Sequence, residues 1–191
     1  MRWQPAAVAT VLVALALAWP YDVGASWTDG VWCLRVIAGL VTLACAFVLD
    51  DQAADIIAPS PTPLRARTLF RVGLAAAWAV PVWSVSLLVV APRIPDVWMG
   101  WASLEFAALL VAGLATAALA ARRYGQSEPG AVASAAIVGG WLLMLTLPGP
   151  VSLFTLRPEA LLSAHLRWTL LLGAGLAVMA TMSRDPALTR R

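Results

Sequence analysis

The chain has 191 residues, of which 61% are hydrophobic and only 12% are charged. Soluble domains contain roughly 45–50% apolar and about 25% charged residues, so this composition excludes an ordinary soluble domain and predicts an all-α, polytopic membrane protein. The formal net charge is +3, and the chain contains arginine but no lysine. We expect a lipid bilayer, not nucleic acid, as the partner of the chain.

Apolar segments separated by polar or proline-containing turns follow one another along the chain. A helix needs roughly 20 apolar residues to cross about 30 Å of hydrocarbon. We therefore predict one transmembrane domain over residues 1–191, with about six spans at 3–19, 31–48, 70–90, 97–121, 131–147 and 167–182. The first segment also imitates a secretory signal, with Arg2 before an apolar run that ends in Ala16-Leu17-Ala18, but we interpret it as the first span.

The longest polar stretch, residues 50–69, joins the second and third predicted spans. Its prolines at positions 59, 61 and 63 prevent a helix from running through it. Before them, residues 49–58 can form a short amphipathic helix, with Ile56 and Ile57 on one side and with Asp50 and Asp51 at the positive N-terminal end. This stiff, charged hairpin suits the docking of another protein, and an ordinary positive-inside loop is the alternative interpretation.

A second connecting segment, residues 151–166, precedes the last predicted span and is only moderately apolar. Pro158 is well placed to open a helix there. We expect a short helix or a re-entrant turn on the outer side of the membrane.

The arginines predict the sidedness of the spans, because cytoplasmic loops carry an excess of basic residues. With the N-terminus inside, nine arginines are cytoplasmic: Arg2, Arg65, Arg67, Arg71, Arg122, Arg123, Arg184, Arg190 and Arg191. Three lie outside (Arg93, Arg157 and Arg167), and Arg35 lies within the second span. Both termini and the 50–69 hairpin are then cytoplasmic. The abundance of alanine and the absence of lysine suggest a bacterial protein, so we expect a multi-pass protein of the bacterial inner (plasma) membrane.

Two charges fall inside predicted spans: Arg35 in the second and Glu105 in the fourth. Each costs roughly 2.5–3.5 kcal/mol in a bilayer even on the lenient insertion scale. Helical spacing places both on stripes of small residues, which are Ala38, Gly39, Thr42 and Ala46 after Arg35 and Ala108, Ala112, Thr116 and Ala120 after Glu105. We predict an ion pair between them. It either fixes helix packing or belongs to a translocation path, and the alternative is that Arg35 snorkels to the outer surface.

Residues for catalysis or metal binding are scarce. Because His165 is the only histidine, the chain by itself cannot form a metal site of several histidines. Cys33 and Cys45 lie about 18 Å apart along one predicted helix and cannot form a disulfide. There is no glycine- and lysine-containing nucleotide loop and no serine and histidine arrangement of a hydrolase, so we expect neither an enzyme nor a cofactor in this chain.

The motif Phe47-Val48-Leu49-Asp50-Asp51, followed by Ser60-Pro61-Thr62-Pro63-Leu64-Arg65, resembles small ABC-2-type permease subunits of actinobacterial ABC transporters. The resemblance implies a six-helix permease that pairs with a second copy or a paralogue and exports an amphipathic or lipid-like substrate. It also implies that the 50–69 hairpin is a coupling helix pressed onto a separate ATP-binding subunit, which holds the ATP and Mg. The coupling residues would be Asp50, Asp51, Asp55, Ile56, Ile57, Pro61, Pro63 and Arg65. A structural or assembly subunit of a larger membrane complex is the alternative function.

Overall fold

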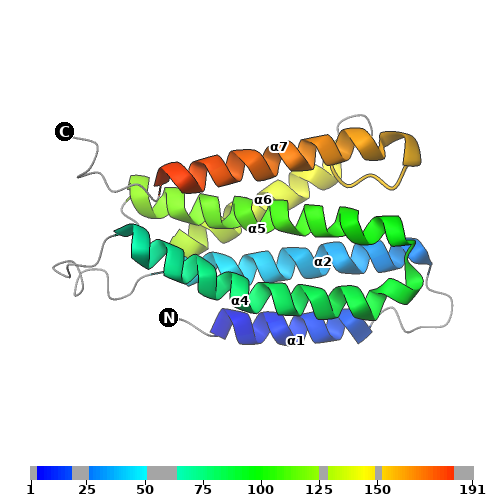
Figure 1. The fold of residues 1–191 in the computed structure, drawn as a ribbon, viewed down its shortest axis with the longest axis horizontal. Helices are drawn as coiled ribbons and strands as arrows, with labels where there is room; N and C mark the ends of the chain where they lie inside the picture. Colours follow the sequence, from blue (N-terminus) through cyan, green and yellow to red (C-terminus); the bar gives the residue numbers. More distant parts are fainter. Residues whose placement is uncertain (1–3, 19–25, 51–63, 125–128, 149–151, 183–191) are drawn as a thin grey trace.

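The computed structural model of the chain describes residues 4–18, 26–50, 64–124, 129–148 and 152–182. These residues form six α-helices and two short 3-10 helices: α1 (Gln4–Ala18), α2 (Trp27–Ala46), η2 (Phe47–Leu49), α4 (Leu64–Val90), η3 (Ala91–Arg93), α5 (Asp96–Tyr124), α6 (Pro129–Thr146) and α7 (Pro158–Met182). The α-helices run in alternating directions, so the start of α1 and the end of α7 lie at the same end of the bundle (Figure 1). The predicted all-α class is confirmed for this part of the chain.

Five stretches of helix in the described residues are long and apolar enough to cross a membrane: Trp27–Ala46, Thr68–Arg93, Asp96–Arg122, Pro129–Thr146 and Glu159–Met182. Helix α1 has 15 residues. At 1.5 Å per residue it rises only about 22 Å, which is less than the roughly 30 Å of a hydrocarbon core. A sixth crossing by α1 therefore stays a prediction.

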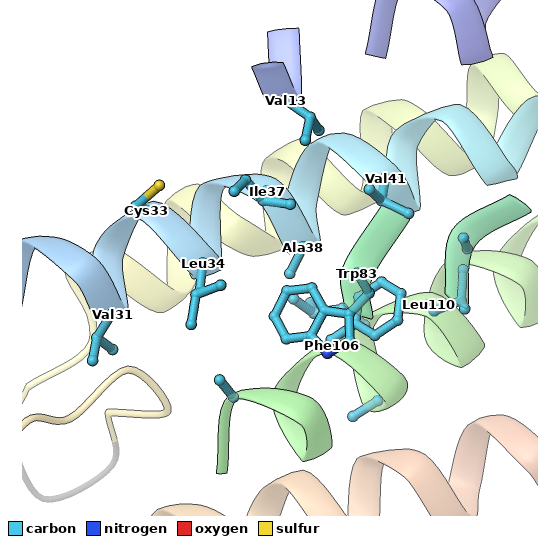
Figure 2. Close-up of a cluster of buried hydrophobic side chains, with 14 of the residues drawn as sticks. Val13, Val31, Cys33, Leu34, Ile37, Ala38, Val41, Trp83, Phe106 and Leu110 are labelled. Carbon is cyan, nitrogen blue, oxygen red and sulfur yellow. The ribbon is translucent and has the colours of Figure 1, made fainter. Parts of the chain in front are cut away.

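Helices α2 and α5 lie at the centre of the bundle. Of their most apolar stretches, 67% of α2 and 56% of α5 are buried, against 28% of α4, 17% of α6 and 22% of α7. The ring of Trp83 from α4 stacks on the ring of Phe106 from α5, with the centroids 4.4 Å apart. Figure 2 shows this pair beside the α2 face that carries Leu34 and Ala38, while Cys33 points to the other side. The apolar core is thus built around α2.

Gly113 permits the close approach of α5 to its neighbours. A Cβ atom at this position would lie 2.8 Å from the Thr42 methyl carbon of α2 and 3.0 Å from Cδ1 of Ile137 of α6. Real Cβ atoms essentially never come that close to another side chain. Thr42, one of the small residues that follow Arg35 at helical spacing, therefore faces α5, and Gly39 of the same stripe faces Trp141 of α6. Small residues commonly lie where membrane helices meet.

Helices α4 and α7 begin furthest ahead of the predicted spans, which start at residues 70 and 167. Helix α4 starts at Leu64, so residues 64–69 of the predicted hairpin are helical. Helix α7 starts at Pro158 and is continuous, so the predicted short element within 151–166 and the predicted span 167–182 form one helix. Proline at the first position and Glu159 in the first turn both favour a helix start there. Only residues 152–157 of the outer segment are non-helical within the described chain.

Candidate functional site

The ion pair between Arg35 and Glu105 lies inside the bundle. Nε of Arg35 donates to Oε2 of Glu105 at 2.8 Å, and Nη2 donates to Oε1 at 2.9 Å. The side chains are only 2% and 5% exposed. Because both oxygens of the carboxylate bind the planar guanidinium, the pair is bidentate, which is the strongest geometry for such a contact. In the structure Arg35 thus does not snorkel to the surface.

Arg35 also holds a segment that is distant in sequence. Its Nη2 donates to the backbone carbonyl of Thr155 at 3.3 Å. Its Cζ lies 5.0 Å from the ring centroids of both Trp32 and Phe154. A guanidinium between two aromatic faces is stabilised by cation–π attraction, and more strongly when water is excluded.

The non-helical residues 152–157 are fastened to this end of the bundle by side chains of α7 as well. Nε1 of Trp168 donates to the carbonyl of Leu153 at 3.0 Å, and Nη1 of Arg167 donates to the carbonyl of Ser152 at 3.2 Å. These donors, together with Arg35, bind three carbonyl groups of the irregular segment.

Phe154 is the centre of an aromatic cluster. Its ring centroid lies 6.2 Å from that of Trp32, 5.6 Å from that of Trp141 and 5.5 Å from that of Trp168. We call this end of the bundle the aromatic end; it carries Trp32, Trp101, Phe154 and Trp168. Two rings of this cluster, those of Trp32 and Phe154, lie against Arg35 of the buried ion pair.

His165 joins the aromatic end from α7 and is only 4% exposed. Its ring lies against that of Trp101, with 3.4 Å between centroids, and its Nδ1 is hydrogen-bonded to the carbonyl oxygen of Leu161. The sequence places this residue in an outer segment and gives it no role. Extending the 3.6-residue period of the last span back through Trp168 would have placed His165 on the inward face of α7.

Several buried polar atoms at the aromatic end have no hydrogen-bond partner among the described residues: Nη1 of Arg35, Nε2 of His165 and Nε1 of both Trp101 and Trp141. Buried polar groups are nearly always paired, so unpaired ones indicate a functional or hydrated site. The aromatic end therefore carries the candidate site, because it brings the buried ion pair and these polar atoms together.

The two predicted coupling residues that the structure describes, Asp50 and Arg65, lie at the opposite end of the bundle. The others, Asp51, Asp55, Ile56, Ile57, Pro61 and Pro63, fall outside the described residues, and Arg65 lies in the first turn of α4. Asp50 is buried, and its Oδ1 accepts a hydrogen bond from the backbone N–H of Gly130 at 2.7 Å. The carboxylate thus sits at the positive N-terminal end of α6. The predicted amphipathic helix over residues 49–58 lies, beyond residue 50, outside the described residues.

Small residues close this second end. Ala46, Ala117, Ala118 and Ala133 form a buried cluster, and we call this the alanine end. There Nη1 of Arg122 donates to the carbonyls of Thr181 and Met182, at 2.9 and 2.6 Å. These are the last carbonyls of α7, where a cation is favourable.

Two grooves lie beside α2 in the described part of the chain. One groove, of about 400 Å³, lies between α1 and α2 and is lined by Leu15, Ala16, Asp29, Trp32, Cys33 and Val36. The other, of about 140 Å³, lies between α2 and α6 and is lined mainly by aliphatic side chains and Trp141. Within the described ranges, no three histidine, cysteine, aspartate or glutamate side chains are grouped so as to hold a metal ion.

Comparison of the chain with protein-family models, with curated proteins and with solved structures gives no match. The support for a function therefore comes from the geometry of these residues.

Proposed function

We propose that the chain is the permease subunit of an ABC-type exporter in a bacterial inner membrane. In this role it pairs with a second permease copy or a paralogue and couples a separate ATP-binding subunit to the movement of an amphipathic or lipid-like substrate. The observation that carries the proposal is the anchored start of the 50–69 segment. The contact between Asp50 and Gly130 fastens the end of η2 to the start of α6.

This anchoring suits a mechanical role. Residues 50–69 begin where α2 ends, and α2 packs against α1, α4, α5 and α6. A displacement of the segment would reach α2 and α6 together at Asp50. From α2 it would reach α5 through Arg35 and Glu105, which form two parallel hydrogen bonds. A rigid chain of contacts of this kind is what a coupling segment requires.

Arginine supports the sidedness that docking needs. Arg65, Arg67 and Arg71 are on the early part of α4, and Arg122 is on the last part of α5, all toward the alanine end. Basic residues are enriched on the cytoplasmic side. The ATP-binding subunit would therefore approach the alanine end.

The surface of the bundle suits a substrate with an apolar part. Both grooves lie beside α2, and the groove between α2 and α6 is almost wholly apolar. The centre between α2 and α5 is filled by core side chains such as Leu34, Ile37 and Phe106. A transport path would thus run along the surface, between this chain and its second copy or paralogue.

The test is to purify the intact complex in mild detergent and to assay it in liposomes. We expect an ATP-binding subunit to co-purify. Asp51→Arg and Pro63→Ala should each reduce substrate-stimulated ATPase activity while the amount of chain in the membrane stays the same. Asp185→Arg, which makes the same charge change in the C-terminal tail, is the matched control.

Two outcomes would overturn the proposal. One is a complex without any ATP-binding subunit. The other is labelling of a cysteine at Ser60 by an impermeant reagent added outside sealed cells, since the segment would then face away from the cytoplasm.

A structural or assembly subunit of a larger membrane complex is the second candidate. The specific observation in its favour is that the ion pair is buried and that Arg35 binds both carboxylate oxygens of Glu105. Such a pair can serve helix packing alone. Depletion of the chain would then dissociate a neighbouring complex, and substrate export by purified complexes would not depend on its presence.

A further inference from the structure

The aromatic end holds the only histidine of the sequence, and a hydrogen bond to this residue defines which nitrogen of its neutral ring carries the hydrogen. Nδ1 of His165 is hydrogen-bonded to the carbonyl oxygen of Leu161. A carbonyl oxygen can only accept, so Nδ1 carries the hydrogen. In the neutral ring Nε2 is then a bare acceptor, and it has no partner among the described residues.

Opposite charges from two other helices act on this ring. The described charged groups that interact electrostatically with His165 are Glu105 of α5 and Arg35 of α2. Trp101, which lies against the imidazole, is one helical turn before Glu105 on α5. A proton on Nε2 would therefore place a second cation near a carboxylate that is already bound by one.

Arg35 divides one nitrogen between two acceptors. Its Nη2 donates to Glu105 at 2.9 Å and to the carbonyl of Thr155 at 3.3 Å. The longer bond is the one by which Arg35 holds residues 152–157. Any shift of the guanidinium away from an added positive charge at His165 would lengthen this bond first, because the bidentate bond to the carboxylate is stronger.

We infer that His165 is a buried proton-binding site, and that proton binding at its Nε2 loosens the hold of Arg35 on residues 152–157. In this step the Nε2 lone pair takes a proton from hydronium and leaves water, and the site gains one positive charge. Glu105 is then shared between the guanidinium and the imidazolium. Ionisable residues that face the interior of a membrane bundle commonly serve proton binding. This inference does not depend on the permease role.

The first experiment observes the proton directly. The full chain is prepared with ¹⁵N-labelled histidine in lipid nanodiscs, where His165 gives the only imidazole signals. We expect the neutral form with hydrogen on Nδ1 at neutral pH, and both nitrogens at the imidazolium position after acidification. Persistence of the neutral form down to the pH at which the chain unfolds would overturn the inference.

The second experiment observes residues 152–157. Cys33 and Cys45 are first replaced by alanine, and Ser152→Cys is then introduced. The measured quantity is the ratio of two labelling rates with an impermeant maleimide, that at Ser152→Cys divided by that at Ser26→Cys. This ratio removes the pH dependence of the thiol itself. On acidification it should rise about two- to tenfold, the factor for loss of one hydrogen bond.

His165→Gln supplies the matched variant, since its amide can hydrogen-bond but binds no proton in this range. The ratio should then be independent of pH. A ratio that rises equally in this variant, or one that stays constant while the ¹⁵N signals show His165 titrating, would refute the link between the proton and residues 152–157.

Discussion

The two ends of the bundle solve the burial of polar groups differently. The aromatic end buries an ion pair together with Phe154 and Thr155 of the irregular segment, and Arg35 of the pair binds the carbonyl of Thr155. The alanine end buries small side chains and keeps its polar contacts at helix termini, with Asp50 at the start of α6 and Arg122 at the end of α7. The first end should therefore be sensitive to the removal of charge, and the second to added volume.

The largest expected effect comes from removing one partner of the ion pair. Arg35→Met or Glu105→Met should lower the free energy of unfolding by roughly 3–5 kcal/mol, because either change leaves a buried partner uncompensated. The double variant Arg35→Met, Glu105→Met should recover most of the loss, since a buried pair costs desolvation that apolar side chains avoid. Equilibrium unfolding in detergent measures all three variants.

The matched control is Val36→Met, which adds a methionine beside Arg35 at an exposed position of α2. It should change stability little. If the double variant lost as much stability as the sum of the two single variants, the two residues would not be coupled. The claim that the aromatic end is sensitive to the removal of charge would then be wrong.

The next effect, at the alanine end, comes from volume. A Cβ at Gly130 would lie 2.8 Å from the backbone Cα of Phe47 and 2.8 Å from Oδ1 of Asp50. Backbone cannot rotate out of the way, so Gly130→Ala should cost about 1–3 kcal/mol, as overpacking does. Thermal unfolding in detergent measures the loss.

Gly139→Ala tests the same exchange on the same helix. A Cβ at Gly139 would meet nothing within 4 Å. Alanine is the better helix former, so this variant should be neutral or more stable by up to about 1 kcal/mol. Equal losses at both positions would mean that contact with Phe47 and Asp50 does not set the cost of the exchange, and the expected sensitivity of the alanine end to added volume would be wrong.

The sequence predicts some of these features because their signals are local. Apolar segment length predicts the helices, and the small residues at helical spacing after Arg35 and Glu105 indicate that both charges face another helix. The structure places the two charges against each other. A stripe of small residues shows which face packs closely, although it does not identify the partner helix.

Other features depend on contacts across the chain. Glu159 and His165 interrupt the hydropathy of α7, so the predicted span begins after them, at Arg167, although the helix begins at Pro158. Asp50 accepts a hydrogen bond from the N–H of Gly130, which is 80 positions further on, and no local pattern in the sequence connects the two residues. Residues 152–157 are likewise held by side chains of α2 and α7, which only the assembled bundle brings together.

The smallest effect separates charge from hydrogen bonding at the alanine end. Asp50→Ala removes the acceptor for the N–H of Gly130 and should cost about 0.5–2 kcal/mol, as the loss of a helix cap does. Asp50→Asn keeps an oxygen acceptor of the same reach, and asparagine caps helices about as well as aspartate. Its loss should therefore be smaller than that of alanine in the same unfolding measurement. If asparagine cost as much as alanine, the negative charge of Asp50 would be what stabilises this end, and both ends of the bundle would then depend on buried charge.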